Sequence, residues 1–302
     1  MVKEKLLNNL SVFVRQQGTE CKFVGGESWT ILSPIEQSIK RKIEAVGTPL
    51  KNWDINIYRG ILTGYNEAFI IDGATKDRLI KEDPKSAEII RPILRGRDIK
   101  KYGYDYADLW LLFIPWHFPL HKDPTIQGAS SKAEQAFKEK YPSIYNHLLQ
   151  YKADLSNRNK AETGVRYEWY ALQRWGANYW DDFSKQKIVW KRVGSILRFS
   201  YDETGTMALD STCFATGKHI KFLVAVLNSK MGHYLMKDAP QTGTGDLLIS
   251  VQAIEPLKIP IPNSTTDKAV ENIIDKILKQ QNTVLEKKID QVVYDLYKLN
   301  KE

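Results

Sequence analysis

The chain has 302 residues, of which 42% are hydrophobic and 11% aromatic, enough apolar material for one large domain or two modest ones. The longest uncharged apolar runs, such as residues 109–115, are too short to cross a bilayer, and the N-terminus lacks the apolar stretch of a secretory signal. The two cysteines, Cys21 and Cys213, belong to no Cys-x-x-Cys pair, which argues against a disulfide framework or a thiolate metal site. We therefore expect a cytoplasmic protein with no membrane contact.

The net charge of +8 at pH 7 is unevenly distributed along the chain. Residues 263–302 hold seven Lys and seven Asp or Glu, so the whole basic excess lies in residues 1–262. Such an excess favours a polyanionic partner, because lysine and arginine release counterions when they neutralise phosphates. Many basic proteins bind no nucleic acid, so charge alone leaves both readings open.

The first predicted elements follow an N-terminal connector, residues 1–32. A Ser-Pro-Ile-Glu sequence beginning at Ser33 predicts a capped helix that runs to about residue 46. In residues 53–71, apolar and polar side chains alternate, and β-branched and aromatic residues are frequent. Because Gly60 and Gly64 interrupt this segment, it predicts a strand pair with a turn.

The next segments are predicted to be mainly helical. Residues 76–80 and 86–93 have the pattern of short helices, and residues 109–114 form a short apolar run that predicts a buried strand. Residues 130–151 carry a helical apolar pattern with a break at Tyr141–Pro142.

Several short strands are expected in the second half of the chain. They are residues 188–190, 196–201, 213–215 and 247–249. Residues 219–235 predict a helix, and residues 258–262 predict an edge strand, since proline cannot donate a hydrogen bond inside a sheet.

The last 40 residues predict one long helix. Its apolar positions recur from Val270 to Leu299, and about 35 helical residues would span roughly 50 Å. So long a helix needs a partner along its length, either antiparallel in the same chain or in another chain. We therefore divide the chain into a connector (1–32), a central domain (33–262) and a C-terminal spacer helix (263–302).

Several catalytic signatures are absent from the sequence. There is no Gly-x-Gly-x-x-Gly run and no phosphate loop, so nucleotide binding has no local support. There is no Pro-Pro pair, so the Asn-Pro-Pro-Tyr turn of an amino-methyltransferase is missing. The nearest approach to a nuclease motif is Asp181–Asp182 with Lys185 and Lys187, and solvated loop charges explain it better. No nucleophilic triad can be assembled from spacing.

His117 and His121 are spaced like a zinc-binding pair. Pro119 between them forbids the regular helix that would make the two rings converge. With only Asp123 nearby as a third ligand, we expect no metal site in this chain. Cys213 is most simply a core residue.

The sequence feature that favours nucleic-acid binding is an interleaving of aromatic and basic residues. Residues 102–201 hold 21 of the 33 aromatic residues. Among them lie basic residues that include Arg158, Arg166, Arg174, Lys185, Lys187, Lys191, Arg192 and Arg198. Arginine can read guanine, lysine can hold phosphate, and aromatic rings can stack on bases. Taken singly, each aromatic residue is better explained as part of a β-rich core.

Four segments in the right order resemble TaqI-like C-terminal target-recognition (specificity) domains of type IIG restriction–modification enzymes and adenine-specific DNA methyltransferases. Residues 58–69 are similar to the RG-xx-TG-x-N-x-AF run that opens such domains, and residues 89–99 to the I-x-P-x-LRG-x-DI run that follows it. Later landmarks fall within residues 141–173. Residues 288–299 resemble the ID-x-xVY-x-LY-x-L signature that closes many of these enzymes. The resemblance covers about residues 30–300.

The resemblance implies an α/β (α+β) fold, with a twisted mixed β-sheet, flanking helices and loops that enter the DNA major groove. It makes residues 33–262 the target-recognition domain and double-stranded DNA the partner. It also implies an adenine-N6 methyltransferase, and usually a nuclease, upstream or on another chain, where S-adenosylmethionine and Mg²⁺ would bind. The C-terminal helix would pack on the methyltransferase domain or subunit. We expect this chain to be non-catalytic and to hold no cofactor itself.

Candidate DNA contacts come from the family runs and from the irregular stretches 116–123 and 164–198. The predicted contacts are Arg59, Arg95, Arg97, Trp116, His117, Arg166, Gln173, Arg174, Trp175, Lys191, Arg192, Arg198, Thr242 and Thr244. Gln173 suits adenine, and Arg174 or Arg192 suits guanine. The Gly-rich loop 241–245 suits a phosphate. Arg95 has a second reading, an internal ion pair with Asp98. Gly60, Gly64 and Gly96 are expected to serve backbone geometry.

Three hypotheses follow from the sequence. The leading one is a sequence-specific duplex DNA recognition module of a type IIG-like system. The second is a free-standing nuclease or methyltransferase with unfamiliar motifs, which would show turnover when Mg²⁺ or S-adenosylmethionine is supplied. The third is a specificity subunit or phage-defence interaction protein whose long helix binds a separate chain.

Overall fold

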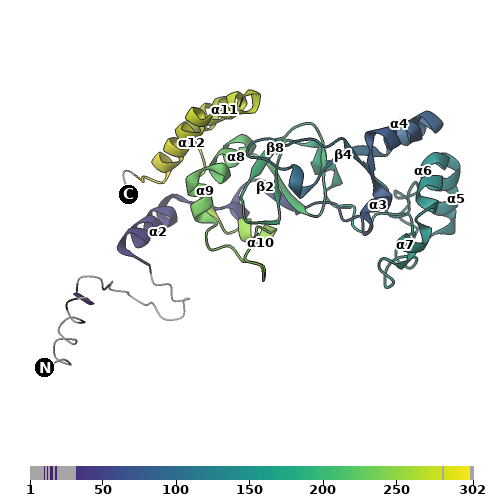
Figure 1. Cartoon of the computed structure of the whole chain (residues 1–302), viewed down its shortest axis with the longest axis horizontal. Helices are drawn as coiled ribbons and strands as arrows, with labels where there is room; N and C mark the ends of the chain where they lie inside the picture. The colour runs from purple at the N-terminus through teal and green to yellow at the C-terminus, as the bar shows by residue number, and fades with distance from the viewer. Residues whose placement is uncertain are drawn as a thin grey trace.

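The structure is a computed structural model that describes residues 32–280 and 282–299, together with Leu10, Val12, Val14, Arg15 and Gly18. The predicted connector, residues 1–32, therefore lies almost wholly outside the described residues. Figure 1 shows an elongated molecule, with β-strands in the middle and helices gathered towards both ends. Within the described ranges, no helix is long and apolar enough to span a membrane.

The first helix, α2 (Pro34–Val46), begins where the sequence predicts it. The Ser33 hydroxyl accepts a hydrogen bond from the Glu36 amide at 3.3 Å, and the Glu36 carboxylate accepts one from the Ser33 amide at 3.0 Å. This capping box satisfies two donors that the helix itself leaves unpaired. The partly buried side chains of Ile39, Ile43 and Val46 in α2 pack against the hydrophobic core that contains Trp190 and Phe222.

An antiparallel sheet of four strands forms the centre of the molecule. Its order is β2 (Ile55–Arg59), β10 (Thr212–Gly217), β6 (Lys187–Lys191) and β8 (Phe199–Asp202). Side chains alternate across a strand, so Ile188 and Trp190 enter one hydrophobic core while Val189 enters another. Each face of this sheet therefore packs against a different hydrophobic core.

Helices cover one face of the central sheet. Nearly every residue of α8 (Ile220–Asn228) is buried, and the helix packs on β6, β8 and β10. The short helices α9 (Lys230–Leu235) and α10 (Val251–Ile254) complete this side. Asn228 ties α8 to the sheet, because its side-chain amide donates to the Phe199 carbonyl at 2.7 Å.

The predicted C-terminal helix is two helices, α11 (Ser264–Lys279) and α12 (Thr283–Leu296). Gln280 has an extended backbone, and the Asn282 side chain caps α12, so the helix stops and restarts. The Tyr297 hydroxyl donates to the Lys258 carbonyl at 2.8 Å, which places the end of α12 beside a residue that lies six positions before the start of α11. The pair is an antiparallel hairpin within the chain, and its apolar face packs on α8.

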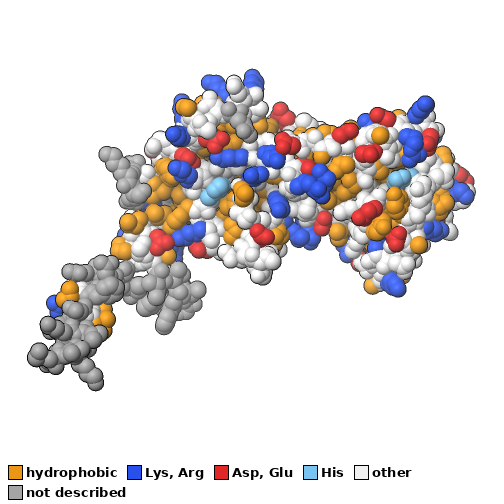
Figure 2. Space-filling model, viewed as in Figure 1, with side chains coloured by type: hydrophobic (Ala, Val, Ile, Leu, Met, Phe, Trp, Pro, Cys, Tyr) orange, Lys and Arg blue, Asp and Glu red, His pale blue; other side chains and the backbone are white. Residues whose placement is uncertain are grey.

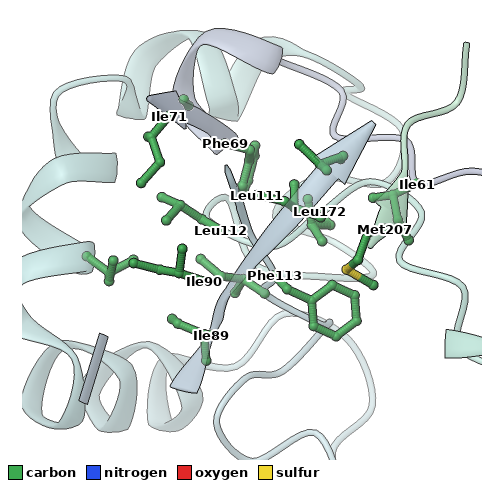
Figure 3. Close-up of a cluster of buried hydrophobic side chains, with 14 of the residues drawn as sticks. Ile61, Phe69, Ile71, Ile89, Ile90, Leu111, Leu112, Phe113, Leu172 and Met207 are labelled. Atoms are coloured by element: carbon green, nitrogen blue, oxygen red, sulfur yellow. The ribbon is translucent and has the colours of Figure 1, made fainter. Parts of the chain in front are cut away.

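A second four-stranded sheet lies on the other side of the molecule. Its order is β3 (Ile70–Asp72), β5 (Leu109–Leu112), β4 (Ile90–Leu94) and β9 (Met207–Ala208). The sheet is mixed, because β9 runs parallel to β4 while the other pairs are antiparallel. Figure 3 shows its core, where Leu111 and Leu112 meet Phe69, Ile90 and Leu172. The mixed α/β fold that the resemblance implies is confirmed.

The helices of this second side are short. They are α3 (Asn66–Phe69), α4 (Gly73–Glu82), α5 (Ser131–Lys140), α6 (Pro142–Leu149) and α7 (Lys152–Asn157). The predicted break at Tyr141–Pro142 separates α5 from α6. Burial of large apolar side chains such as Phe137, worth about 1.5–3 kcal/mol each, fixes these helices against the sheet.

The remaining elements are short. Two short antiparallel pairs occur, β1 (Thr48–Pro49) with β12 (Lys258–Ile259) and β7 (Val193–Gly194) with β11 (Leu247–Leu248). The 3-10 helices are η1 (Leu50–Asn52), η2 (Pro84–Glu88), η3 (Gly96–Asp98) and η4 (Trp180–Ser184). The predicted edge strand at 258–262 is confirmed in its first two residues.

Three other sequence predictions were wrong in detail. Residues 53–71 are not a hairpin, because β2 joins the central sheet and β3 joins the second sheet, with α3 between them. Residues 86–93 end as strand β4, whose apolar residues are buried from both sides. Residues 219–235 are two helices, because the Ser229 hydroxyl caps α9 by accepting from the Gly232 amide at 3.1 Å.

Candidate nucleic-acid interface

Two adjoining cavities form a groove where the second sheet meets the central sheet. The larger, of about 540 Å³, is lined by Asn66, Glu67, Ile70, Arg95, Gly96, Arg97, Leu109, Lys191, Leu209 and Ser211. The smaller, of about 170 Å³, is lined by Gly96, Arg97, Ile99, Lys191, Gly194, Ser195, Ile196 and Arg198. Because Arg97 and Lys191 line both cavities, we treat them as one basic groove. Figure 2 shows Lys and Arg side chains gathered near the middle of the visible face.

The η3 turn positions the arginines of the LRG-x-DI run. Arg95 donates from Nε and Nη2 to the Asp98 carboxylate at 3.1 and 2.8 Å, and this contact raises the pKa of the Arg95 guanidinium. The internal ion pair that the sequence left open for Arg95 is therefore present. Arg97, two residues later, is exposed at the groove.

Gly96 allows the two sides of the groove to approach closely. A Cβ atom at this position would lie 3.0 Å from Cγ of Lys191, tighter than ordinary van der Waals contact. The Gly96 amide also donates to the Ser211 hydroxyl at 3.1 Å. The glycine thus lets η3 lie against the side chain of Lys191, as its predicted role in backbone geometry requires.

The Gly-rich loop 241–245 is attached to the same region. It caps a hairpin whose strand β11 pairs with β7, and the Ile249 amide donates to the Arg192 carbonyl at 2.8 Å. The Thr242 and Thr244 hydroxyls lie 2.9 Å apart, and the Gly245 amide donates to the Thr242 carbonyl at 2.9 Å. The structure therefore places the loop next to the segment that carries Lys191 and Arg192.

The predicted basic contacts divide into paired and unpaired cations. Arg59 pairs with Asp210 at 3.4 Å, and Arg95 pairs with Asp98. Four others have no acidic partner within 4 Å among the described residues, and these are Arg97, Lys191, Arg192 and Arg198. The Nε atom of Arg192 is also buried, and it has no hydrogen-bond partner among the residues that the structure describes. Three of the four, Arg97, Lys191 and Arg198, line the groove, and unpaired cations that share a groove favour an anionic ligand.

A second basic cluster surrounds Trp116. The indole ring stacks on Tyr167 with a centroid distance of 4.8 Å. The guanidinium carbons of Arg166 and Arg174 lie 5.5 and 5.9 Å from the Trp116 ring centroid. We call these three side chains, Trp116, Arg166 and Arg174, the tryptophan platform.

Glu162 holds both arginines of the platform. Its carboxylate accepts from Arg166 Nη1 and from Arg174 Nη2, each at 2.9 Å. The hydrogen bond from Arg174 is the main cause that lowers the pKa of Glu162. The sequence analysis missed Glu162, although its spacing of four residues from Arg166 is a signal for such a pair.

Three other predicted contacts are partly committed to the fold. His117 donates from its amide to the buried Glu168 carboxylate at 2.8 Å, and its Nδ1 lies 3.0 Å from the same group. Trp175 packs on the Phe113 ring at 6.3 Å, and Gln173 is half-buried near Gly64. Their contact with DNA stays a prediction.

The groove and the tryptophan platform are joined through the backbone. Leu209, which lines the groove, forms a β-bridge with Ile61. The next residue, Leu62, forms a bridge with Arg174 of the platform. Two adjacent backbone pairings therefore connect the clusters, which lie far apart in sequence.

Several basic and aromatic residues of the interleaved region serve the fold. Lys187 is fully buried and pairs with Asp202, and Lys185 pairs with Asp182 at 2.5 Å. Arg158 donates to the carbonyls of residues 63, 169 and 171, and burial lowers its pKa to about 10. Trp190 is only 1% exposed, so its ring belongs to the core.

No metal site is found at the histidine pair. Burial lowers the pKa of His121, and its Nδ1 is buried without a hydrogen-bond partner among the described residues. Within the described ranges there is no group of three or more His, Cys, Asp or Glu side chains that suits a metal ion.

The fold and the groove together define an α/β protein with the charge arrangement of one that binds an anionic polymer. The family model of the TaqI-like C-terminal specificity domain matches residues 91–261. The chain belongs to this family, and the resemblance read from the four sequence segments is confirmed.

The chain is also similar to individual proteins. The chain is 22% identical over 245 residues to the type II methyltransferase M.MjaIV of Methanocaldococcus jannaschii, covering 78% of this chain and 76% of the relative. Its fold is similar to that of the type IIL restriction–modification enzyme MmeI, solved in complex with DNA, with a TM-score of 0.54 and 13% identity over 85% of this chain. The type IIG restriction endonuclease BpuSI gives a TM-score of 0.46 and 15% identity over 87% of the chain. The chain spans about a third of these two solved chains, 34% and 32%.

Proposed function

We propose that this chain is the sequence-specific, double-stranded DNA recognition module of a type IIG-like restriction–modification enzyme. The observation that carries the proposal is the groove with its three unpaired cations, Arg97, Lys191 and Arg198, in a domain of a specificity family. Lysine and arginine in such a groove would hold phosphates and fix the register on the duplex. The neighbouring tryptophan platform would contribute to base readout.

We further propose that the module positions an adenine-N6 methyltransferase, and in some assemblies a nuclease, on its target. The M. jannaschii relative is named a type II methyltransferase, and MmeI is a restriction–modification enzyme. The described residues present no donor set for Mg²⁺, and the sequence has no phosphate loop. We expect S-adenosylmethionine and Mg²⁺ to bind to the methyltransferase and nuclease parts.

The contact between the C-terminal helices and a methyltransferase stays a proposal. The apolar face of α11 and α12 packs on α8, so a methyltransferase would meet the outer, polar face of the hairpin. A substitution set confined to exposed residues, Lys287, Lys288 and Gln291 to Ala, tests this contact in a pull-down with the methyltransferase. Unchanged capture would refute it.

DNA binding is tested with fluorescent duplexes at a series of salt concentrations. We expect the triple variant Arg97→Ala, Lys191→Ala, Arg198→Ala to bind more weakly and to have a shallower salt dependence. The slope of log affinity against log salt should fall by about 0.9 for each phosphate that the variant no longer neutralises. A matched control removes three charges from exposed residues of α4 and α5, by Lys81→Ala, Lys138→Ala and Lys140→Ala.

Two results would contradict the proposal. If both triple variants lose the same affinity, net charge and not the groove governs binding. If selection from a randomised duplex pool enriches no motif while binding stays tight, the recognition is not sequence-specific.

A further inference from the structure

One of the apolar residues that line the basic groove is strongly exposed. Ile196 is 63% exposed and lines the smaller cavity with Arg97, Lys191 and Arg198. Among the described large apolar residues that are exposed, Ile196 is the one that lines either cavity. Single exposed apolar residues are common on protein surfaces, but one within an unneutralised basic groove is placed where a ligand would cover it.

The loop that carries Ile196 is anchored at both ends. Before it, β7 pairs with β11, so that Val193 and Gly194 are held by the hairpin of the Gly-rich loop. After it, Phe199 begins β8 and pairs with Trp190 in the central sheet. A β-branched side chain on such a short, anchored loop has few rotamers to lose on binding.

The chemistry of the groove separates two kinds of contact. The cations around Ile196 suit phosphate oxygens, whereas an isoleucine side chain offers neither charge nor a hydrogen bond. In the major groove of DNA, the apolar group that a base presents is the 5-methyl of thymine. Contact with that methyl would bury Ile196 and distinguish thymine from the other bases.

We propose that Ile196 reads the 5-methyl group of one thymine in the target site. The proposal rests on the proposed function, because it needs a duplex seated in the groove. It assigns to Ile196 an apolar contact with a base, which the charged side chains beside it cannot make.

The experiment compares thymine with uracil, which lacks only the methyl group. Each thymine of the selected target is replaced singly by uracil, and the affinity of each duplex is measured for the wild type and for Ile196→Ala. We expect one uracil substitution to weaken binding by the wild type roughly fourfold, the value of one buried methyl group. The Ile196→Ala variant should bind the two forms of that duplex equally, with an unchanged salt slope.

Ile261→Ala is the matched control, since Ile261 is 55% exposed and lines neither cavity. This variant should keep the full uracil effect. Ile196→Val, which retains a β-branched side chain, should keep most of it. Thermal unfolding of each variant shows that it remains folded.

The outcomes are distinct. A target without thymine, a wild type insensitive to every uracil, or an uracil effect that persists in Ile196→Ala would each overturn the assignment. Loss of affinity in Ile196→Ala without any uracil effect would indicate insertion between bases instead and would also overturn it. If the wild type selects no duplex sequence at all, the proposed function itself fails.

Discussion

The buried Lys187–Asp202 ion pair allows a prediction whose magnitude follows from the structure. Both side chains are 0% exposed, and Lys187 also donates to the Phe183 carbonyl at 2.6 Å. The pair joins β6 to β8, opposite the end of these strands that carries the groove cations. Lys187→Met keeps the length of the aliphatic stem but removes the charge, so the effect is mainly electrostatic.

Removing one partner of a buried pair costs about 3–5 kcal/mol, because the other charge is left uncompensated. Asp202 would keep the hydrogen bonds from the Tyr104 and Thr204 hydroxyls at 2.8 and 2.7 Å. We therefore expect Lys187→Met to lower the free energy of unfolding by about 3 kcal/mol, the lower end of that range. The double variant Lys187→Met, Asp202→Asn removes the buried charge and should recover about 2 kcal/mol of this loss.

The assay is urea unfolding followed by circular dichroism, at several pH values. Burial alone would raise the pKa of Asp202, but in the wild type the charge and hydrogen bond of Lys187, with the hydrogen bonds from Thr204 and Tyr104, keep that pKa below its usual value. Without Lys187, burial should raise the folded-state pKa above the unfolded one, so the destabilisation should shrink as pH falls. A loss below about 1 kcal/mol, or a double variant whose loss equals the sum of the single losses, would refute this reasoning.

Two further predictions concern the tryptophan platform and the buried side chain of His147. Glu162→Gln should release Arg166 and Arg174 and so tighten non-specific DNA binding. The slope of log affinity against log salt should steepen by about 0.9 for each further phosphate that the two arginines neutralise. An unchanged slope in duplex titrations would contradict this prediction. Burial lowers the pKa of His147, so its contribution to stability is present above its unfolded pKa of about 6.5 and is lost as pH falls below it. His147→Gln can still donate to the Ala68 carbonyl, and its melting temperature should fall less than that of the wild type between about pH 6.5 and 5. Equal slopes in differential scanning fluorimetry would exclude His147 as a source.

The sequence was sufficient for features that depend on near neighbours. The Ser33 capping box, the break at Tyr141–Pro142 and the strands around Trp190 and Phe214 follow from local patterns, and the structure contains them. The family runs also sufficed to identify the specificity domain, because their residues and order are properties of the sequence itself. The basic excess before residue 263 favoured an anionic partner.

Tertiary structure decided what depends on distant neighbours. The sequence could not show that β2 and β3 enter different sheets, because alternation is the same in either sheet. Nor could it separate the cations, since Arg59 meets Asp210 across 151 positions while Lys191 meets Arg97 in a groove. Ion pairing depends on distance in space, so only the folded chain distinguishes a cation that stabilises the protein from one that is available to DNA.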